Sequence, residues 1–394
     1  MGKSPLILAA LAKAAVSSLD IKSVRRLNGS QTGLFDSAVL CCTDGSEFVI
    51  RIPETTNGAL ELDIETAVLK SLNSETRSKL SFKVTRIAGE TQDTNRNRVV
   101  VFDYLYGAPV DLGRLMSNSP TLASIGQCIA EIHSLDPEIV RGSGLPEFSA
   151  ADVAKRRMNE LDNVAMTGLV PRSLLERWQD ALEDVSLFQY PPTVVHGEMA
   201  ESNVLEIDQQ VSAVLNWGGL HIGDPADDFT WIAGKRNFDL LDAARIAYSQ
   251  GTKAFDATLT QRAVLYSELS HARWLLHGTQ TNDQTIIDEA SGELEVLAAE
   301  LAEGILPSLG SVGISVLSNT EASFVSDSFV AETLIESVDS TGAIHSIDEV
   351  VVVGAVDDLS LDKVADGQNE TSTEFVDDRT REIELPEKTD NELF

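Results

Sequence analysis

The sequence predicts an α+β fold in which a mostly antiparallel, strand-rich N-terminal lobe precedes a helical C-terminal lobe. Short apolar stretches separated by turns fill the first hundred residues, helical spacing dominates from residue 121, and the composition becomes acidic at residue 311. The 394 residues, 43% of them hydrophobic, suffice for more than one core. We expect an N-terminal lobe over 1–106, a helical lobe over 107–308 and an acidic tail over 309–394.

The N-terminal lobe is predicted to be a helix followed by a five-stranded antiparallel sheet. Lys3 before an apolar segment is also typical of a signal peptide, but Lys13 interrupts that segment, so we favour a helix that caps the lobe. A helix over 60–72 should follow the third strand. The strands are expected at residues 24–27, 37–42, 47–52, 82–87 and 98–104.

The C-terminal lobe is predicted from apolar residues that recur every three or four positions. His133 ends the first of its helices, and we favour a buried structural histidine there over a catalytic base. Arg273 and Trp274, near the end of a later helix, are interpreted as packing residues. The helices are expected at residues 121–135, 152–168, 172–187, 240–249, 259–277 and 285–301.

Residues 193–234 contain the densest group of polar side chains at strand ends and loops. A short apolar strand at 193–195 precedes a polar loop and a hairpin, and a second strand at 211–215 ends in Asn216 before a glycine-rich turn. Such spacing suits phosphoryl transfer, in which one acceptor orients a hydroxyl and nearby oxygens ligate Mg²⁺. The polar residues are His196, Glu198, Asn203, Asn216, Asp224, Asp227 and Asp228.

This stretch resembles the aminoglycoside phosphotransferase and choline kinase superfamily, and most closely its macrolide-phosphotransferase-like branch. The matching motifs are His196-Gly197-Glu198, Asn203, Leu215-Asn216-Trp217, Gly223-Asp224-Pro225 and Asp228-Phe229. The resemblance covers roughly residues 18 to 305. It implies a two-lobe protein-kinase-like fold and transfer of a phosphoryl group from ATP or GTP, with Mg²⁺, to a hydroxyl of a small molecule.

The resemblance also implies roles for individual residues. Glu198 would orient the substrate hydroxyl, and Asn203 and Asn216 would hold Mg²⁺. In the N-terminal lobe, Arg51 would contact the phosphates and pair with Glu65. The remaining nucleotide contacts would come from Gly29 and Ser30 in a glycine loop and from the main chain of a hinge at Asp103 and Leu105.

Two positions depart from the family pattern, which has aspartate where this chain has Glu198 and Asn216. The glutamate reaches farther by one methylene, and the asparagine lacks the charge of a metal-binding carboxylate. Asp224 or Glu201 could supply that charge. Two functions therefore stay open: a small-molecule kinase, and a catalytically degenerate pseudokinase that serves as a nucleotide-binding or protein-interaction module.

Charge and cysteine content limit the partners and the compartment. A net charge of −32 argues against nucleic acid or an anionic membrane as a partner, and no apolar run is long enough to predict a membrane span. The three cysteines are expected to be buried thiols in a reducing cytoplasm. Residues 311–394 carry 20 acidic and 4 basic side chains. We expect a largely disordered tail there, or a protein-binding segment in which Val350–Val353 adds a strand to a sheet.

Overall fold

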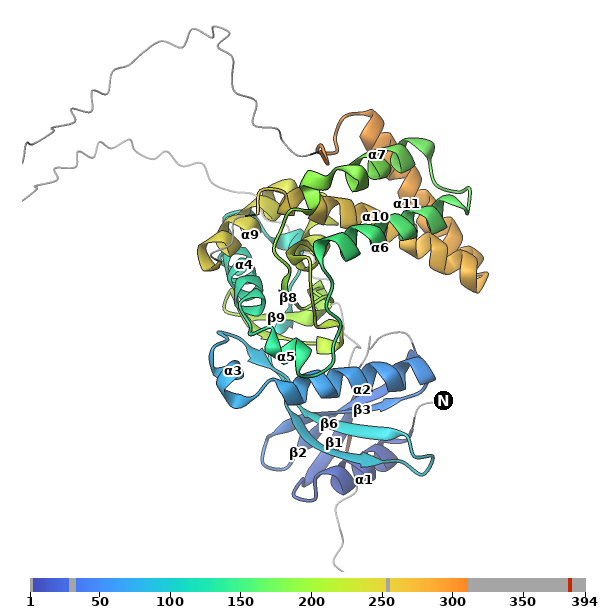
Figure 1. The fold of residues 1–394 in the computed structure, drawn as a ribbon. Coiled ribbons are helices and arrows are strands. Elements are labelled where there is room, and N and C mark those ends of the chain that lie inside the picture. The colour runs from blue at the N-terminus through green and yellow to red at the C-terminus, as the bar shows by residue number, and fades with distance from the viewer. Residues whose placement is uncertain (1–2, 28–32, 253–255, 311–381, 385–394) are drawn as a thin grey trace, which may run out of the picture. The chain divides into compact units, whose positions relative to one another are not determined.

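The computed structural model describes residues 3–27, 33–252, 256–310 and 382–384 (Figure 1). Its N-terminal part is an antiparallel sheet with the strand order β12-β1-β2-β3-β6-β5. Four of the five strands expected from the sequence lie in this sheet, residues 87–92 supply another, and a short segment near the C-terminus adds a sixth at the β1 edge. The strands are β1 (Ile21–Arg26), β2 (Phe35–Cys42), β3 (Glu47–Pro53), β5 (Ile87–Gln92), β6 (Arg98–Asp103) and β12 (Glu382–Glu384).

One strand prediction was wrong. The fourth strand of the sheet is residues 87–92, whereas 82–87 was expected. The residues just before it form the short β4 (Lys83–Val84), which pairs in parallel with β10 (Gln210–Val214) of another sheet. The apolar run at 82–87 is therefore divided between two sheets, and a local pattern cannot reveal that division.

A helix covers each face of the N-terminal sheet. α1 (Pro5–Ala15) is capped by Ser4, whose hydroxyl accepts the N–H of Ile7, so the predicted N-terminal helix is confirmed. Leu8 of α1 shares a buried cluster with Val99 and Val101 of β6. The intervening Val100 and the following Phe102 face the other cluster, which contains α2 (Thr56–Ser71). This alternation follows from the two-residue period of a strand.

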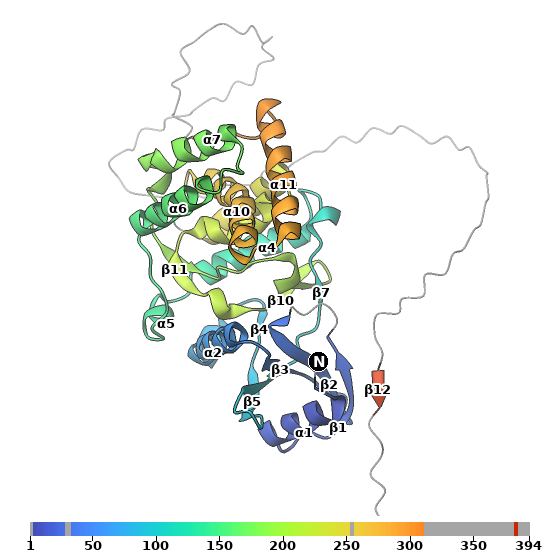
Figure 2. The same cartoon turned by 90° about the vertical axis from the view of Figure 1, so that its right-hand side faces the viewer.

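The C-terminal part is mainly helical. α4 packs along α9 and α10 along α11, and α10 also contacts α6 (Figures 1 and 2). All six predicted helices are present, and α6 ends before Gly168, which has φ of 70°, and Pro171. The long helices are α4 (Pro120–His133), α6 (Ala150–Ala165), α7 (Arg172–Glu183), α9 (Phe238–Gly251), α10 (Leu259–Thr281) and α11 (Gln284–Ala302). The short ones are α5 (Glu138–Arg141) and α8 (Thr230–Ala233), whereas α3 (Ser74–Ser78) follows α2 in the N-terminal part of the chain.

Short strands and turns hold the polar stretch identified in the sequence. β8 pairs with β11, which the sequence analysis interpreted as a glycine-rich turn, and a hairpin joins β9 to β10. The hairpin turn consists of Asp208 and Gln209, both with positive φ, as tight two-residue hairpins require. The strands are β7 (Ala108–Pro109), β8 (Thr193–Val195), β9 (Val204–Ile207) and β11 (His221–Gly223), and the 3₁₀ turns are η2 (Leu112–Arg114), η3 (Val185–Phe188), η4 (Glu201–Asn203), η5 (Trp217–Gly219) and η6 (Pro225–Phe229).

Two further expectations needed revision. Trp274 is 42% exposed and stacks on His277, and the side chain of Arg273 is 43% exposed, so neither is a packing residue of the core. Cys42 and Cys128 are buried as expected, but Cys41 is half-buried, and its Sγ donates to Glu47 Oε1 at 3.3 Å. All three thiols are free.

Some residues singled out in the sequence lie outside the part of the chain that the structure describes. Gly29 and Ser30 of the glycine loop lie outside the described residues, and so does Val350–Val353 of the acidic segment. Across the described ranges, none of the helices has the length and apolar character that crossing a membrane would require.

Candidate functional site

The loop that carries Glu198 is anchored by the buried carboxylate of Asp228. Its two oxygens accept the backbone N–H groups of His196 and Gly197, each at 2.8 Å, and Oδ2 also lies 3.0 Å from His133 Nε2. Burial by itself would raise the pKa of Asp228, but the hydrogen bond and charge of His133 and the backbone donor outweigh it, and the pKa is lowered. His133 is buried and supports this carboxylate, so its predicted structural role is confirmed.

His196 ties the same loop to the segment that carries Asn216. Its Nε2 lies 3.1 Å from the carbonyl oxygen of Leu215, which can only accept, so Nε2 carries the proton. Nδ1 accepts the N–H of Glu198 at 3.3 Å. Burial lowers the pKa of His196, which keeps the ring neutral and suits one donating and one accepting nitrogen.

Two glycines allow these segments to approach closely. Gly197 has φ of 79°, and a β-carbon there would lie 2.5 Å from the carbonyl oxygen of Gly219. A β-carbon on Gly219 would lie 2.6 Å from Cγ of Glu198. Both distances are shorter than van der Waals contact, so the geometry of the loop requires glycine at both positions.

The structure brings three predicted site residues together. Asn216 Nδ2 donates to Glu198 Oε2 at 2.5 Å, and Asn203 Nδ2 donates to the backbone carbonyl of Glu198 at 2.8 Å. Asn216 has φ of 64° and ψ of 63°, a left-handed conformation that asparagine tolerates better than most residues. Both amide nitrogens are therefore directed at Glu198. Among the described residues, the amide oxygen of Asn216 accepts no hydrogen bond, and that of Asn203 accepts one long bond, from the Ser202 hydroxyl at 3.5 Å.

Arg51 and Glu65 also meet as expected. Arg51 Nη1 donates to Glu65 Oε2 at 2.8 Å, and the guanidinium lies over the rings of Phe35 and Phe102, at 5.0 and 5.8 Å from their centroids. The same helix contacts the Asn216 turn, because a β-carbon on Gly218 would meet Cβ of Glu65 at 4.0 Å. The predicted nucleotide side of the site thus adjoins the loop that carries Glu198.

Glu198 lies in an environment that disfavours its charge. Burial is the main cause, and the nearby carboxylates of Glu61 and Glu65 add to it, while the hydrogen bond from Asn216 opposes them. Together these raise the pKa of Glu198 to about 7. Burial and the charge of Glu65 also raise the pKa of Glu61, although Arg51 opposes the shift. At neutral pH, Glu198 can therefore exchange a proton.

Neither acidic residue proposed to replace the missing charge at Asn216 is free to do so. Asp224 is fully buried and accepts from Arg262 Nε at 2.7 Å and from the Tyr266 hydroxyl at 2.6 Å. Glu201 accepts from Lys235 Nζ at 2.7 Å and from a backbone N–H at 2.8 Å. Both hold other elements in place, and the carboxylate that contacts Asn216 is that of Glu198.

The hinge residues differ in their backbone hydrogen bonds. The N–H of Asp103 donates to the carbonyl of Arg86 at 3.0 Å and is used within the fold. Leu105 lies outside any strand, and its backbone N–H and C=O have no hydrogen-bond partner among the described residues. Of the two predicted hinge residues, Leu105 therefore offers both a free donor and a free acceptor.

A cavity of about 1090 Å³ opens beside the Glu198 loop. Its walls come from that loop, the turn after Asn216, β11, α6, α8 and α10. Arg273 lines this cavity, which explains its exposure. The polar and charged lining residues are Arg156, Arg157, Asn159, Glu160, Asn163, His221, Asp227, Thr230, Ser267, Ser270, His271 and Arg273.

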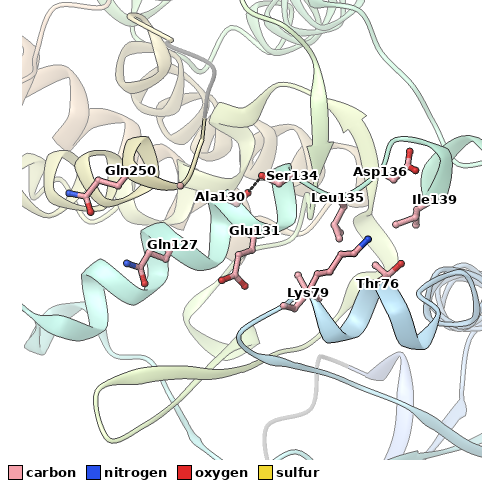
Figure 3. A pocket seen from close by; sticks show the side chains of 12 residues that line it. Thr76, Lys79, Gln127, Ala130, Glu131, Ser134, Leu135, Asp136, Ile139 and Gln250 are labelled. Carbon is pink, nitrogen blue, oxygen red and sulfur yellow. Dashed lines mark hydrogen bonds between the residues drawn. The ribbon is translucent and has the colours of Figure 1, made fainter. Parts of the chain in front are cut away.

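A second cavity, of about 530 Å³, lies among α3, α4, α5 and the end of α9 (Figure 3). Its charged side chains are Lys79, Glu131 and Asp136, and one oxygen of Glu131 already accepts the N–H of Ser81 at 2.7 Å. It contains none of the predicted site residues. The candidate active site is therefore the larger cavity together with the loop that carries Glu198.

Three further residues complete the site, and the sequence predicted no role for them: Asp228, His221 and Arg157. A signal was present for Arg157: it occupies the middle of a row with Val153 and Leu161, at four-residue intervals on a helix face that is buried at both ends. An arginine there must find carboxylates or a ligand.

This fold and site define a kinase-like phosphotransferase. Residues 33–264, more than half of the chain, match the phosphotransferase enzyme family, and the chain belongs to that family.

Similar proteins agree with this assignment. The chain is 30% identical over 111 residues to the uncharacterized protein YcbJ of Bacillus subtilis (strain 168), a match that covers 28% of this chain and about a third (35%) of that protein. Macrolide 2'-phosphotransferase MphH from Brachybacterium faecium is similar in structure, with a TM-score of 0.62 and 22% identity, over 73% of this chain and 97% of that one. The GDP complex of aminoglycoside 2'-phosphotransferase-IIIa has a TM-score of 0.62 and 16% identity, over 76% and 100%. At these identities, the likeness to the two solved structures establishes the fold.

Proposed function

We propose that this protein transfers the γ-phosphoryl group of ATP or GTP to a hydroxyl of a small molecule, with Glu198 as the general base. The observation that carries the proposal is the position of the Glu198 carboxylate. It is held by Asn216, adjoins the helix whose Glu65 pairs with Arg51, and lies next to a cavity large enough for an acceptor.

The proposed reaction needs one proton acceptor. The acceptor hydroxyl gives its proton to Glu198 as its oxygen bonds to the γ-phosphorus, and the bond from that phosphorus to the β–γ bridging oxygen breaks. The nucleoside diphosphate leaves with the bond electrons. A carboxylate with a pKa of about 7 suits this role, because a base works best when its pKa lies near the operating pH.

The nucleotide would contact the N-terminal lobe. One nitrogen of Arg51 is bound to Glu65, while its Nε is buried and has no hydrogen-bond partner among the described residues. A guanidinium fixed in this way can bind phosphate oxygens, and Leu105 can pair with the edge of the base through its backbone. The similar aminoglycoside phosphotransferase was solved as a complex with GDP, which supports nucleotide binding by this fold. Gly29 and Ser30 are proposed to cover the phosphates.

Asn203 and Asn216 would hold Mg²⁺ through their amide oxygens. The donor set fits this ion in kind, because both amide nitrogens are already directed at Glu198 and Mg²⁺ prefers oxygen ligands. Among the described residues, no cluster of three or more His, Cys, Asp or Glu side chains could enclose a metal, so phosphate oxygens would complete the coordination. When bound, the ion would neutralise charge on the phosphates.

Nucleotide titration tests the binding half of the proposal. ATP and GTP are titrated calorimetrically into the full chain with and without Mg²⁺, and into Arg51→Ala and Arg172→Ala. We expect micromolar binding that Mg²⁺ strengthens and that Arg51→Ala weakens by at least about tenfold, through loss of a charged contact. Arg172, on the exposed start of α7, is the matched control and should change the affinity less than about twofold. Absence of heat at millimolar nucleotide would refute the proposal.

A nucleotide-binding module without catalysis is the second candidate. The short hydrogen bond from Asn216 occupies one oxygen of the proposed base, and Asn216 lacks the charge of the usual metal-binding carboxylate. This candidate predicts the same titration result without phosphoryl transfer. Release of γ-phosphate from bound nucleotide therefore separates the two.

A further inference from the structure

The charge of the large cavity indicates which acceptors it can hold. We propose that the acceptor carries a single negative charge, a carboxylate, in addition to the hydroxyl that is phosphorylated. This inference rests on the proposed function for its account of the hydroxyl, while the charge preference rests on the cavity alone.

The cavity has an excess of positive charge in a chain whose net charge is −32. Three arginines line it, Arg156, Arg157 and Arg273, against two carboxylates, Glu160 and Asp227. Burial is the main cause that lowers the pKa of His271, which also lines the cavity, so this imidazole is neutral at pH 7 and adds no charge. The arginines and carboxylates of the lining therefore sum to one unbalanced positive charge.

Arg157 and Arg273 already form ion pairs with both carboxylates of the lining. Arg157 lies over the ring of Tyr266, at 4.4 Å, and contacts Asp227 Oδ1 at 2.6 Å and Glu160 Oε2 at 3.3 Å. Arg273 Nε contacts the other oxygen of Glu160 at 3.0 Å. This pairing leaves no carboxylate over for a cationic ligand. The Nε of Arg157 is buried and has no hydrogen-bond partner among the described residues.

Of the three arginines that line the cavity, Arg156 is the one that neither Glu160 nor Asp227 contacts. Its guanidinium stacks on the ring of Phe148 at 4.0 Å, and within the described part of the chain it makes no ion pair. Phe148 packs edge-on against His221, with ring centroids 5.7 Å apart. His221 Nδ1 donates to the carbonyl of Gly219 at 2.7 Å, and Gly219 abuts Glu198. Stacking on an aromatic ring fixes the plane of a guanidinium and leaves its N–H groups free for a carboxylate.

These contacts form one continuous wall from the proposed base to the free guanidinium. A ligand whose hydroxyl lies at Glu198 can extend along His221 and Phe148 and place an anionic group at Arg156. A polyamine would instead bring its cations against three guanidinium groups, while both carboxylates of the lining are already paired with Arg157 and Arg273. The wall therefore selects by charge as well as by size.

Fluorescent glycosides that differ in one carboxylate test the inference. 4-Methylumbelliferyl β-D-glucuronide and 4-methylumbelliferyl β-D-glucoside are titrated into the full chain, with kanamycin as a polycationic competitor. The glucuronide should bind on the order of tenfold tighter than the glucoside, as expected for one charge-assisted contact, and kanamycin should displace neither. Equal affinities, displacement by kanamycin, or failure of the glucuronide to bind would overturn the inference.

Variants assign the preference to Arg156. Arg156→Ala should reduce the ratio of the two affinities to about twofold, and Arg156→Glu should make the glucoside the tighter ligand. Arg156 is exposed, so both variants should fold, and thermal melting checks this. Arg172→Ala should leave the ratio unchanged. A ratio that is the same in all three variants would show that Arg156 does not bind the carboxylate.

Nucleotide titration in the same samples keeps the two proposals separate. Nucleotide binding without a charge preference would overturn this inference and leave the phosphotransferase proposal standing. A charge preference that Arg156→Ala removes, in a protein that binds no nucleotide, would support the inference and refute the proposed function.

Discussion

Burial, two neighbouring carboxylates and one amide set the pKa of the residue proposed as the base. Glu198 is half-buried, it is influenced by the charges of Glu61 and Glu65, and Asn216 donates to it. A glutamate in water has a pKa of about 4.5 and is almost fully ionised at pH 7. In this protein the pKa is about 7, so a protonated and an ionised form coexist at neutral pH. The ionised form is the one that can accept a proton.

The raised pKa predicts how stability depends on pH. The pKa of Glu198 is about 7 in the folded chain against an ordinary value of 4.5, so between these values the folded protein binds more protons than the unfolded chain. The contribution of Glu198 to the free energy of unfolding is therefore fully present below pH 4.5 and is lost as the pH rises through 7. The Glu198→Gln variant has no group that titrates at this position, so its free energy of unfolding does not show this decrease. Urea unfolding from pH 5 to 8 should show the variant gaining about 1–2 kcal/mol relative to wild type, after allowance for solvent screening.

A constant difference in unfolding free energy across that range would contradict the raised pKa. Asp242→Asn is a suitable control, because Asp242 is exposed and its contact is a 3.4 Å pair with Arg245 one helical turn away. Its difference from wild type should stay within about 0.5 kcal/mol at every pH.

Among the elements, the buried carboxylate of Asp228 holds the loop that carries Glu198 against α4. Asp228→Ala would leave two backbone N–H groups, those of His196 and Gly197, and the ring of His133 without their acceptor. Burying unpaired donors is costly, so we expect a loss of about 3 kcal/mol in the free energy of unfolding. Chemical denaturation measures it, with Asp242→Ala as the exposed control. A loss below about 1 kcal/mol would show that the loop does not depend on this anchor.

The close approach of η5 to the loop gives a separate prediction. A methyl group in Gly219→Ala would collide with Cγ of Glu198, at 2.6 Å, and displace the carboxylate. We expect phosphoryl transfer to fall by at least about 100-fold, while nucleotide affinity changes less than about threefold, because a small displacement of a catalytic group is enough to lose its alignment. Rapid-quench transfer and nucleotide titration separate the two effects.

Gly292→Ala is the matched control for that substitution. Gly292 lies inside α11, and a β-carbon there would meet nothing within 4 Å. The variant should keep full activity and gain about 0.5–1 kcal/mol of stability, since alanine favours a helix over glycine. Equal activity of the Gly219 and Gly292 variants would contradict the proposed contact with Glu198.

The sequence predicted which residues form strands and helices better than it predicted which strands pair with one another. The order of strands and helices followed from apolar periodicity. The motif spacing singled out Glu198, Asn203 and Asn216, which the structure brings into contact. Strand pairing was harder to predict, because β4 pairs with β10, more than a hundred residues away in the chain, and β11 has only three residues. The cavity depends on side chains from α6, β11 and α10 that only the tertiary fold brings together. Arg156, exposed on α6, carried no signal in the sequence.

At the scale of the whole molecule, the sheet and the helical part supply different halves of the proposed reaction. Arg51 and Glu65 come from the N-terminal sheet and α2, whereas Glu198, Asn203 and Asn216 come from the loops between short strands of the helical part. Contact between α2 and η5 joins these halves. The acceptor cavity lies farther along, among α6, α8 and α10. In the reaction we propose, Glu198 accepts the proton when the γ-phosphoryl group is transferred.

The pH dependence of γ-phosphate release tests that claim most directly. The full chain and its Glu198→Gln variant are incubated with γ-labelled GTP or ATP and Mg²⁺ from pH 5.5 to 9, with water as the acceptor, at saturating nucleotide. We predict a rate that rises with an apparent pKa near 7 and then levels off, and a variant that is slower by at least about 100-fold at equal nucleotide affinity. Release that is undetectable in wild type, independent of pH, or equal in the two proteins would contradict the assignment of Glu198 as the base.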